Sequence, residues 1–246
     1  MSIKKILVSQ HTPTNLAPYN SLSEEFGVEF TFKPFFSIEP LPSRDFRAQR
    51  INLLDYTAVV FSSRHAIDAY FSLASELRIK VPETMKYFCT TEAVAMYLQK
   101  HIVYRKRKIF FGDGTPQSVI DQIGTKHEAE KFLITTSDNS RNESLTRLLD
   151  EKGTDYTTAV FVTSVLQDLK DINPHDYDMI VLYNAYDVKS IQQNWPDFQQ
   201  EEIKFMAYGK TIVSSMEAAG LEIAMKAPTP SCPSVAKALQ TYLKQQ

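Results

Sequence analysis

The apolar positions of this sequence follow two alternating patterns. Short runs in which nearly every position is apolar or β-branched are typical of strands buried in a parallel sheet. They predict strands at Lys5–Ser9, Glu29–Phe35, Ala58–Ser62, Lys86–Cys89, Lys108–Phe111, Phe132–Thr135, Tyr156–Val162, Met179–Tyr183 and Lys204–Ala207. Between most of them, helical spacing of apolar residues predicts amphipathic helices at Arg64–Leu77, Thr91–Gln99, Glu143–Glu151, Lys210–Ala219 and Val235–Lys244. This alternation predicts an α/β fold, with parallel sheets covered by helices on both faces.

The pattern occurs twice along the chain. Lys5-Ile-Leu-Val is echoed 126 positions later by Lys131-Phe-Leu-Ile, and the same offset relates Gly27-Val-Glu-Phe to Gly153-Thr-Asp-Tyr. Further on, Tyr56-Thr-Ala-Val-Val-Phe is echoed by Tyr177-Asp-Met-Ile-Val-Leu, and Lys86-Tyr-Phe-Cys by Lys204-Phe-Met-Ala. Four echoes in the same order favour an internal duplication over chance similarity between two α/β units.

Two segments have the character of linkers. Residues 36–43 contain two prolines, which disfavour a helix or a central strand, and residues 162–170 are extended and rich in β-formers. They lie about 126 positions apart, so they occupy equivalent places in the two copies. We therefore expect an inserted domain at residues 43–161, a discontinuous domain made of residues 1–36 and 168–246, and linkers at residues 37–42 and 162–167.

Composition removes several classes of function. A net charge of −2 provides no overall field that would recruit nucleic acid. Only 7 glycines occur in 246 residues, which disfavours a phosphate-cradling loop as the central device. Cys89 and Cys232 are far apart and fit small core residues in a reducing compartment. The N-terminus has no signal-peptide core, and no apolar run approaches the ~18–20 residues of a membrane span, so we expect a cytoplasmic protein.

The usual cofactor and metal signatures are absent from the sequence. Gly112-Asp-Gly114 follows a predicted strand, but Gln117 stands where a dinucleotide turn has its third glycine, and a simple turn explains the segment better. There is no Walker A sequence, no His-Glu-x-x-His, no paired Cys-x-x-Cys and no Gly-x-Ser-x-Gly. The sequence therefore gives no support for a metal site.

Polar residues gather where predicted strands end and helices begin. Five such junctions start at Phe61, Cys89, Thr136, Leu182 and Ala207. Each offers helix N-terminal N–H groups with hydroxyl or amide side chains, which bind carboxylates and phosphates, and ligands of open α/β sheets lie beyond the carboxyl ends of the strands. For any single junction, helix capping is the favoured explanation. Five together in a duplicated fold favour a binding cleft.

A basic run, His101-Ile-Val-Tyr-Arg-Lys-Arg-Lys108, allows two interpretations. It could attract a polyanion, or it could be a solvated strand edge protected by charge. We favour the strand edge.

The ordered junctions resemble the uroporphyrinogen-III synthase family over nearly the whole chain. The family's Phe-Thr-Ser strand end followed by a helix is matched by Val60-Phe-Ser-Ser-Arg-His-Ala-Ile67. Its later strand ending near Gly, with a helix that ends in Gly, is matched by Tyr208-Gly-Lys-Thr211 through Glu217-Ala-Ala-Gly220. Its Pro-rich segment before the last helix is matched by Ala227-Pro-Thr-Pro-Ser-Cys-Pro-Ser-Val235. Phe132-Leu-Ile, Arg141 and the segment from Leu145 to Gly153 resemble its mid-chain strand and helix.

The resemblance implies two similar three-layer α/β domains with parallel sheets, joined by a two-stranded β linker. It also implies a cofactor-independent lyase of tetrapyrrole biosynthesis, which closes linear hydroxymethylbilane into a ring with inversion of the last pyrrole. The partner would be this small linear tetrapyrrole, with no nucleic acid and no membrane, and the protein would be a monomer. The residues expected to contact the substrate's acidic groups are Ser62, Ser63, Arg64, Thr90, Thr91, Ser137, Arg141, Asn184, Gly209, Lys210 and Thr211.

One departure from the family bears on the chemistry. The family usually has a Tyr on the strand that enters the second linker, a plausible general acid, but Phe161 or Val162 stands there in this chain. Neither can donate a proton, so our hypothesis is that Tyr183, Tyr186 or Tyr208 supplies the hydroxyl. Two alternatives remain at this point: a family member that binds a tetrapyrrole or another polyanion without catalysis, and a sugar- or nucleotide-processing enzyme of similar build.

Overall fold

The chain forms two compact units. The computed structural model describes residues 3–138 and 142–245. Unit 1 consists of residues 1–37 and 165–246, and unit 2 of residues 38–164. Both boundaries fall inside the ranges 37–42 and 162–167 that the sequence marks as linkers.

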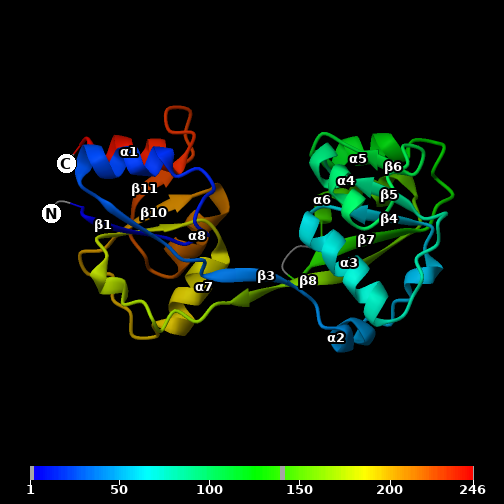
Figure 1. Cartoon of the computed structure of the whole chain (residues 1–246), viewed down its shortest axis with the longest axis horizontal. Helices are drawn as coiled ribbons and strands as arrows, with labels where there is room; N and C mark the ends of the chain where they lie inside the picture. Colours follow the sequence, from blue (N-terminus) through cyan, green and yellow to red (C-terminus); the bar gives the residue numbers. More distant parts are fainter. Residues whose placement is uncertain (1–2, 139–141, 246) are drawn as a thin grey trace. The chain divides into compact units, whose positions relative to one another are not determined.

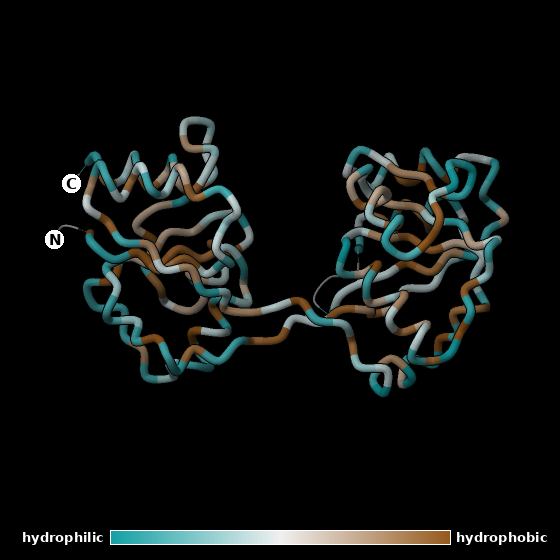
Figure 2. The backbone as a smooth tube through the Cα atoms, in the orientation of Figure 1, coloured by the Kyte–Doolittle hydropathy of each residue, from teal (hydrophilic) through white to brown (hydrophobic). Residues whose placement is uncertain are grey.

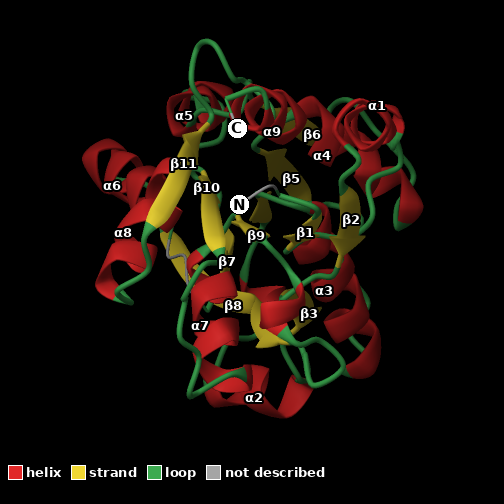
Figure 3. Ribbon diagram, turned by 90° about the vertical axis from the view of Figure 1, so that its left-hand side faces the viewer, coloured by secondary structure: helices red, strands yellow, loops and turns green. Residues whose placement is uncertain are grey.

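Unit 1 contains a five-stranded sheet in which all pairs are parallel (Figure 1). Its strands, in spatial order, are β11 (Ile223–Ala227), β10 (Lys204–Tyr208), β9 (Met179–Leu182), β1 (Lys5–Val8) and β2 (Glu29–Phe32). Its helices are α1 (Ala17–Phe26), α7 (Ala185–Asn194), α8 (Lys210–Ala218) and α9 (Val235–Leu243). In unit 1, Figure 3 shows α1 and α9 on one side of the strands and α7 and α8 on the other.

Unit 2 contains a six-stranded sheet. In spatial order its strands are β3 (Phe36–Pro40), β8 (Tyr156–Leu166), β7 (Phe132–Ser137), β4 (Ala58–Phe61), β5 (Lys86–Cys89) and β6 (Ile109–Phe111). The pairs from β8 to β6 are parallel. Its helices are α2 (Ser43–Ala48), α3 (Arg64–Glu76), α4 (Glu92–Tyr97), α5 (Pro116–Ile123) and α6 (Glu143–Lys152).

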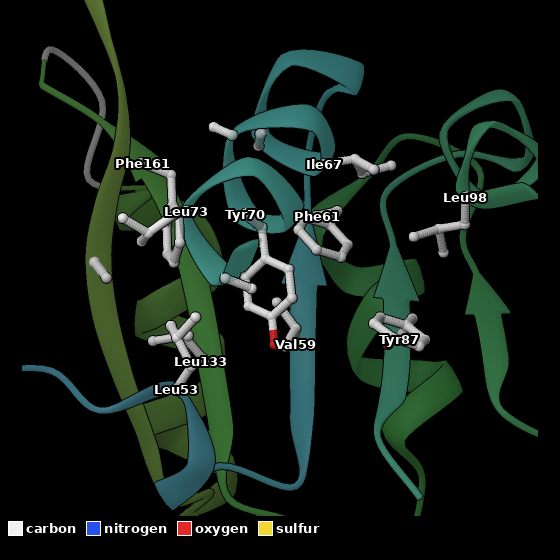
Figure 4. Packing of buried hydrophobic residues seen from close by; sticks show 14 of the residues in the cluster. Leu53, Val59, Phe61, Ile67, Tyr70, Leu73, Tyr87, Leu98, Leu133 and Phe161 are labelled. Carbon is white, nitrogen blue, oxygen red and sulfur yellow. The ribbon is translucent and has the colours of Figure 1, made fainter. Parts of the chain in front are cut away.

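Burial of both sheet faces explains why the strands read as continuous apolar runs. All four residues of β4 are buried, but they alternate between two cores. Val59 and Phe61 pack with Ile67 and Tyr70 of α3, as the close view in Figure 4 shows. Val60 packs on the opposite face, in the cluster that contains residues of α5 and α6. Figure 2 shows hydrophobic residues, in brown, along the strands inside each unit.

The two sheets share one strand order. The order β2-β1-β9-β10-β11 in unit 1 corresponds to β8-β7-β4-β5-β6 in unit 2. Each of the four sequence echoes relates two strands that occupy the same position in their sheets. The pairs are β1 with β7, β2 with β8, β4 with β9 and β5 with β10. Unit 1 has the doubly wound order 2-1-3-4-5, whose ligand-binding switch point lies between the first and third strands. These points are β1/β9 in unit 1 and β7/β4 in unit 2.

Several elements differ from the sequence prediction. The apolar pattern does not predict helices α1, α2, α5 and α7 or strands β3 and β11, and β8 runs on to Leu166. The two prolines of residues 36–43 are compatible with β3 because it is an edge strand that ends at Pro40.

The interpretation of the basic run 101–108 as a strand edge is wrong, because the run is not part of a strand. Residues 101–108 form turns and loop, and the edge strand β6 begins only at Ile109. The physical reason is that four successive cationic side chains provide no alternate apolar face that the sheet could bury.

Candidate functional site

A cavity of about 500 Å³ lies at the carboxyl ends of β4 and β5 in unit 2. This is beside the switch point between β4 and β7, where the topology places ligands. Its lining residues come from these strand ends and from the starts of α5 and α6: Val60, Ser62, Thr90, Gly114, Pro116, Val119, Asn142, Glu143, Ser144 and Leu145. The volume falls within the range of small-molecule sites, roughly 300–1,000 Å³.

The cavity has an apolar wall and a polar rim. Val60, Val119 and Leu145 belong to the buried cluster on this face of the sheet. Ser62 and Thr90 are the first residues after β4 and β5, so their hydroxyls lie where the sheet stops. The Thr90 hydroxyl donates to the Ser62 carbonyl at 3.4 Å, and the Gly114 N–H donates to the Thr90 carbonyl at 2.8 Å. Gly114 has φ 103°, a conformation that favours glycine.

Helix α6 reaches the cavity without a side-chain cap from its N-cap residue. The side chains of Ser63, Thr91 and Thr115 accept N–H groups at the starts of α3, α4 and α5. At α6, by contrast, the N-cap residue Asn142 has φ 53° and its amide donates to the Thr135 carbonyl at 3.1 Å. The first N–H groups of α6 therefore keep the partial positive charge of a helix start beside the cavity.

The equivalent place in unit 1 is filled by tyrosines. Tyr183 directly follows β9, and Tyr208 is the last residue of β10. The centroids of their rings are 5.4 Å apart. Both rings and that of Tyr19 pack against the buried cluster that contains Val181. The Tyr208 hydroxyl donates to the Pro233 carbonyl at 2.9 Å, and the hydroxyls of Tyr183 and Tyr19 are hydrogen-bonded.

The switch point of unit 1 holds a fully buried carboxylate. Asp187 is 0% exposed, and its Oδ2 accepts hydrogen bonds from the Ser9 hydroxyl at 2.8 Å and from the N–H groups of Tyr183 and Asn184 at 2.7 and 2.9 Å. Its Oδ1 has no hydrogen-bond partner among the described residues. Burial raises the pKa of Asp187 to about 6, although these hydrogen bonds oppose the shift. Asp187 thus ties the end of β1 to the start of α7.

The three candidate acids differ in their surroundings. Burial raises the pKa of Tyr183, so its phenol is a weaker acid than an exposed tyrosine. Tyr186 lies on the first turn of α7, 5.5 Å from the ring of Phe36, with the Lys189 ammonium 4.4 Å from its ring centroid. Phe161 and Val162, where the family has its usual Tyr, are 2% and 6% exposed. The Phe161 ring packs against those of Phe46 and Tyr70, and Figure 4 shows it beside Tyr70.

The residues predicted to contact the substrate lie in both units and have different surroundings. Ser62 and Thr90 line the cavity, whereas Ser63 and Thr91 cap helices and Ser137 ends β7. The Arg64 guanidinium lies 5.4 Å from the centroid of the Tyr97 ring. Arg141 lies outside the described residues. In unit 1, Asn184 caps α7, Gly209 precedes α8, and Lys210 and Thr211 are exposed on its first turn.

The sequence prediction does not include Asp187, Asn142, Glu143 or Ser144. The spacing Asn184-x-x-Asp187 is that of a capping box and could have identified Asp187 as a capping residue. No local pattern marks Asn142 or Ser144, because they reach the cavity only when β7 pairs with β4.

The described residues lack two further features. No group of three or more His, Cys, Asp and Glu side chains could hold a metal ion. No helix in the described ranges has the length and apolar character needed to cross a membrane.

Comparison with known proteins assigns the family. The family described as Uroporphyrinogen-III synthase HemD matches residues 17–237. No curated protein matches the chain in sequence. The fold is similar to that of uroporphyrinogen-III synthetase from Helicobacter pylori, with 16% identity, a TM-score of 0.60, and coverage of 99% of this chain and 100% of the other. It is also similar to a mutant uroporphyrinogen III synthase from Thermus thermophilus, with 13% identity, a TM-score of 0.53 and the same coverage. The family match spans both units, and the chain therefore belongs to the uroporphyrinogen-III synthase family.

Proposed function

We propose that the protein is a uroporphyrinogen-III synthase, which closes hydroxymethylbilane into uroporphyrinogen III. The observation that carries the proposal is the family match across residues 17–237, which includes the strand ends of both units. In this reaction the terminal hydroxyl leaves as water, the last pyrrole ring is inverted through a spiro intermediate, and the macrocycle closes.

The strand ends supply groups suited to such a substrate. Hydroxymethylbilane carries acetate and propionate side chains, and helix starts with hydroxyl side chains bind carboxylates. Ser62 and Thr90 at the cavity, with the start of α6, offer this chemistry in unit 2. The protein's main task is to orient the reacting ring so that direct closure without inversion is excluded.

A general acid assists the departure of water. We propose that Tyr186 or Tyr208, rather than the buried Tyr183, supplies this proton, because burial raises the pKa of Tyr183. Replacing Tyr183, Tyr186 and Tyr208 one at a time with Phe identifies the donor. The variant that lacks the donor should have a kcat lower by roughly 10²-fold or more. Full activity in all three single variants would contradict a tyrosine donor.

Product analysis tests the function directly. Fresh hydroxymethylbilane is supplied in the same tube, the products are oxidised, and the type I and type III isomers are separated by chromatography. A type III excess over the spontaneous type I background supports the proposal. Type I alone from folded protein overturns it and favours a family member that binds without catalysis.

We further propose that the enzyme is a cofactor-independent lyase and acts as a cytoplasmic monomer. Light scattering after size exclusion tests the oligomeric state, with a mass near 28.1 kDa expected. Retention of type III synthesis after exhaustive dialysis against a chelator tests independence from metal ions.

A further inference from the structure

A second cavity lies at the amino ends of β5 and β6, at the opposite end of β5 from Thr90. Its volume is about 200 Å³, and it is lined by Val81, Pro82, Glu83, Met85, Tyr87, Ile102, Val103, Arg105, Lys108 and Ile109. Met85, Tyr87 and Ile109 belong to the buried core that contains α3 residues, so the fold fixes the floor of this cavity. Val103, by contrast, is 77% exposed, the highest value among the described large hydrophobic residues.

A turn made only of cations forms part of the rim. The Lys108 N–H donates to the Arg105 carbonyl at 2.9 Å, which closes a β-turn over residues 105–108, Arg-Lys-Arg-Lys. Turns are usually built from Gly, Pro, Asn, Asp or Ser, and four adjacent like charges repel one another. The turn geometry does not require this composition, and a bound anion would relieve the repulsion.

Neighbouring groups offset little of this charge. The Arg105 guanidinium lies 3.6 Å from the Glu83 carboxylate in an exposed pair, and such pairs are weak. The Lys108 ammonium donates to the backbone carbonyl of Glu83, which is neutral. Lys106 and Arg107 are exposed, and neither forms an ion pair with any residue in the described ranges.

We propose that this surface docks an acidic segment of a partner protein, with one apolar side chain of that segment in the cavity. We call the cavity lining together with Lys106 and Arg107 the basic pocket. The volume of about 200 Å³ is below the roughly 300–1,000 Å³ of small-molecule sites, and it suits a single side chain. Because Lys106 and Arg107 lie outside the lining, the charge extends past the cavity and matches a ligand longer than that side chain.

The shape of the basic pocket favours a peptide over a membrane or a nucleic acid. Basic side chains bind an anionic membrane surface or a phosphate backbone without needing an apolar cavity. Single-stranded nucleic acid also uses exposed aromatic rings on which bases stack. Tyr87 is the aromatic residue of the described lining, and at 4% exposed it is too deeply buried to serve as such a ring.

The test uses a short peptide of alternating Asp and Glu with one central Phe and an uncharged fluorophore, titrated into the full chain and followed by anisotropy. We expect saturable binding that weakens as the salt concentration rises. Lys106→Glu/Arg107→Glu should weaken it about tenfold or more, because two attractive charges become repulsive. The matched control is Arg44→Glu/Arg47→Glu, the same change of charge at exposed positions of α2, and it should keep the affinity within about twofold.

Two further measurements test the cavity itself. The same peptide with Gly in place of Phe should bind about tenfold more weakly, because no side chain enters the cavity. With labelled Met and Ile methyl groups, the Phe peptide should shift the signals of Met85, Ile102 and Ile109, which line the cavity. Lys106→Gln/Arg107→Gln, which removes the charges without reversing them, should give an intermediate affinity and serves if the Glu variant does not fold.

Several results would overturn the proposal. They are equal affinity for the Phe and Gly peptides, methyl shifts confined to residues outside the basic pocket, and unchanged affinity in the folded variants at Lys106 and Arg107. Binding of phosphatidylserine vesicles or single-stranded DNA by a protein that does not bind the peptide would also reject it.

The isomer assay separates this proposal from the proposed function. Type III synthesis should be the same in the natural protein and in Lys106→Glu/Arg107→Glu, because the basic pocket lies at the opposite end of β5 from Thr90. A protein that binds the peptide but yields only the type I isomer would reject the proposed function and support the docking surface. Loss of type III synthesis in the folded variant would assign the turn to the reaction and overturn its role in docking.

Discussion

Asp187 shows how much one side chain contributes at the residue scale. It is fully buried at the switch point of unit 1 and holds Ser9, Tyr183 and Asn184 through one oxygen, while the other oxygen lacks a partner among the described residues. Burial of a carboxylate with a half-satisfied hydrogen-bonding capacity favours its neutral form, which is why its pKa is raised.

This raised pKa predicts a pH-dependent stability. The pKa is about 6 in the folded state against 3.8 for an unperturbed Asp, so the folded state binds more protons between these values. The contribution is fully present below pH ~4 and is lost as the pH rises through ~6, by about 3 kcal/mol. Urea unfolding at several pH values should show that Asp187→Asn flattens this part of the profile. Parallel profiles for the natural protein and the variant would contradict the assignment.

Tyr183 gives a second prediction at this scale. Because burial raises its pKa and its hydroxyl is bonded to Tyr19, Tyr183→Phe should keep kcat within about tenfold of the natural protein. The readout is the initial rate of type III formation, compared with the rates of Tyr186→Phe and Tyr208→Phe, which replace the two proposed donors. A larger loss of rate in Tyr183→Phe than in both of these variants would identify Tyr183 as the acid.

At the scale of elements, the strand-to-helix junctions combine two roles that neighbouring residues divide. Ser63 Oγ accepts the Ala66 N–H at 3.1 Å and caps α3, whereas the adjacent Ser62 lines the cavity. The hydrogen bond to the Ala66 N–H gives the Ser63 side chain a local role as a helix cap. The position of Ser62 at the cavity is instead a product of the tertiary structure.

The adjacent serines therefore make a matched pair. Ser63→Ala should lower the free energy of unfolding by about 1 kcal/mol and leave KM within about twofold. Ser62→Ala should leave stability within about 0.5 kcal/mol and raise KM. Chemical denaturation and steady-state kinetics on both variants measure these two effects. A raised KM in Ser63→Ala with an unchanged KM in Ser62→Ala would show that Ser63 is the contact to the substrate.

Prediction of elements from the sequence is most accurate for buried strands. The strands β4, β5, β9 and β10 lie within one residue of their predicted bounds because all of them are apolar on both faces. Helices α1 and α7 escape prediction: α1 has only Leu22 buried, and α7 buries Asp187 and Ser190 among its apolar residues, so neither has a clear apolar stripe in the sequence.

For the whole molecule, each unit has its own sheet and its own cores on both faces. The clusters of unit 2 contain only residues between Phe46 and Val162 among their buried members, and those of unit 1 contain none of these. A unit that buries its own apolar surface can fold alone.

Residues 38–164 expressed alone should therefore give a cooperative thermal transition and native helix content by circular dichroism. A chain in which a short Gly-Ser linker joins Ser37 to Val165 should do the same for unit 1. The full-length protein is the reference. A molten state of either piece, with secondary structure but no near-ultraviolet signal, would show that the units depend on one another.

The sequence by itself determined the fold class and the family resemblance, and it predicts the duplication and the places of the linkers. These follow from hydrophobic periodicity, Pro placement and motif order, all of which are local or linear properties. Only the tertiary structure decided which polar junction residues share a site. Asn142 and Ser144 line the same cavity as Ser62 and Thr90 only because β7 pairs with β4. Ser63 and Thr91, one position further along the chain, cap α3 and α4 instead. The physical reason is that a site joins residues distant along the chain, and strand pairing, which brings them together, leaves no trace in the spacing of any one segment.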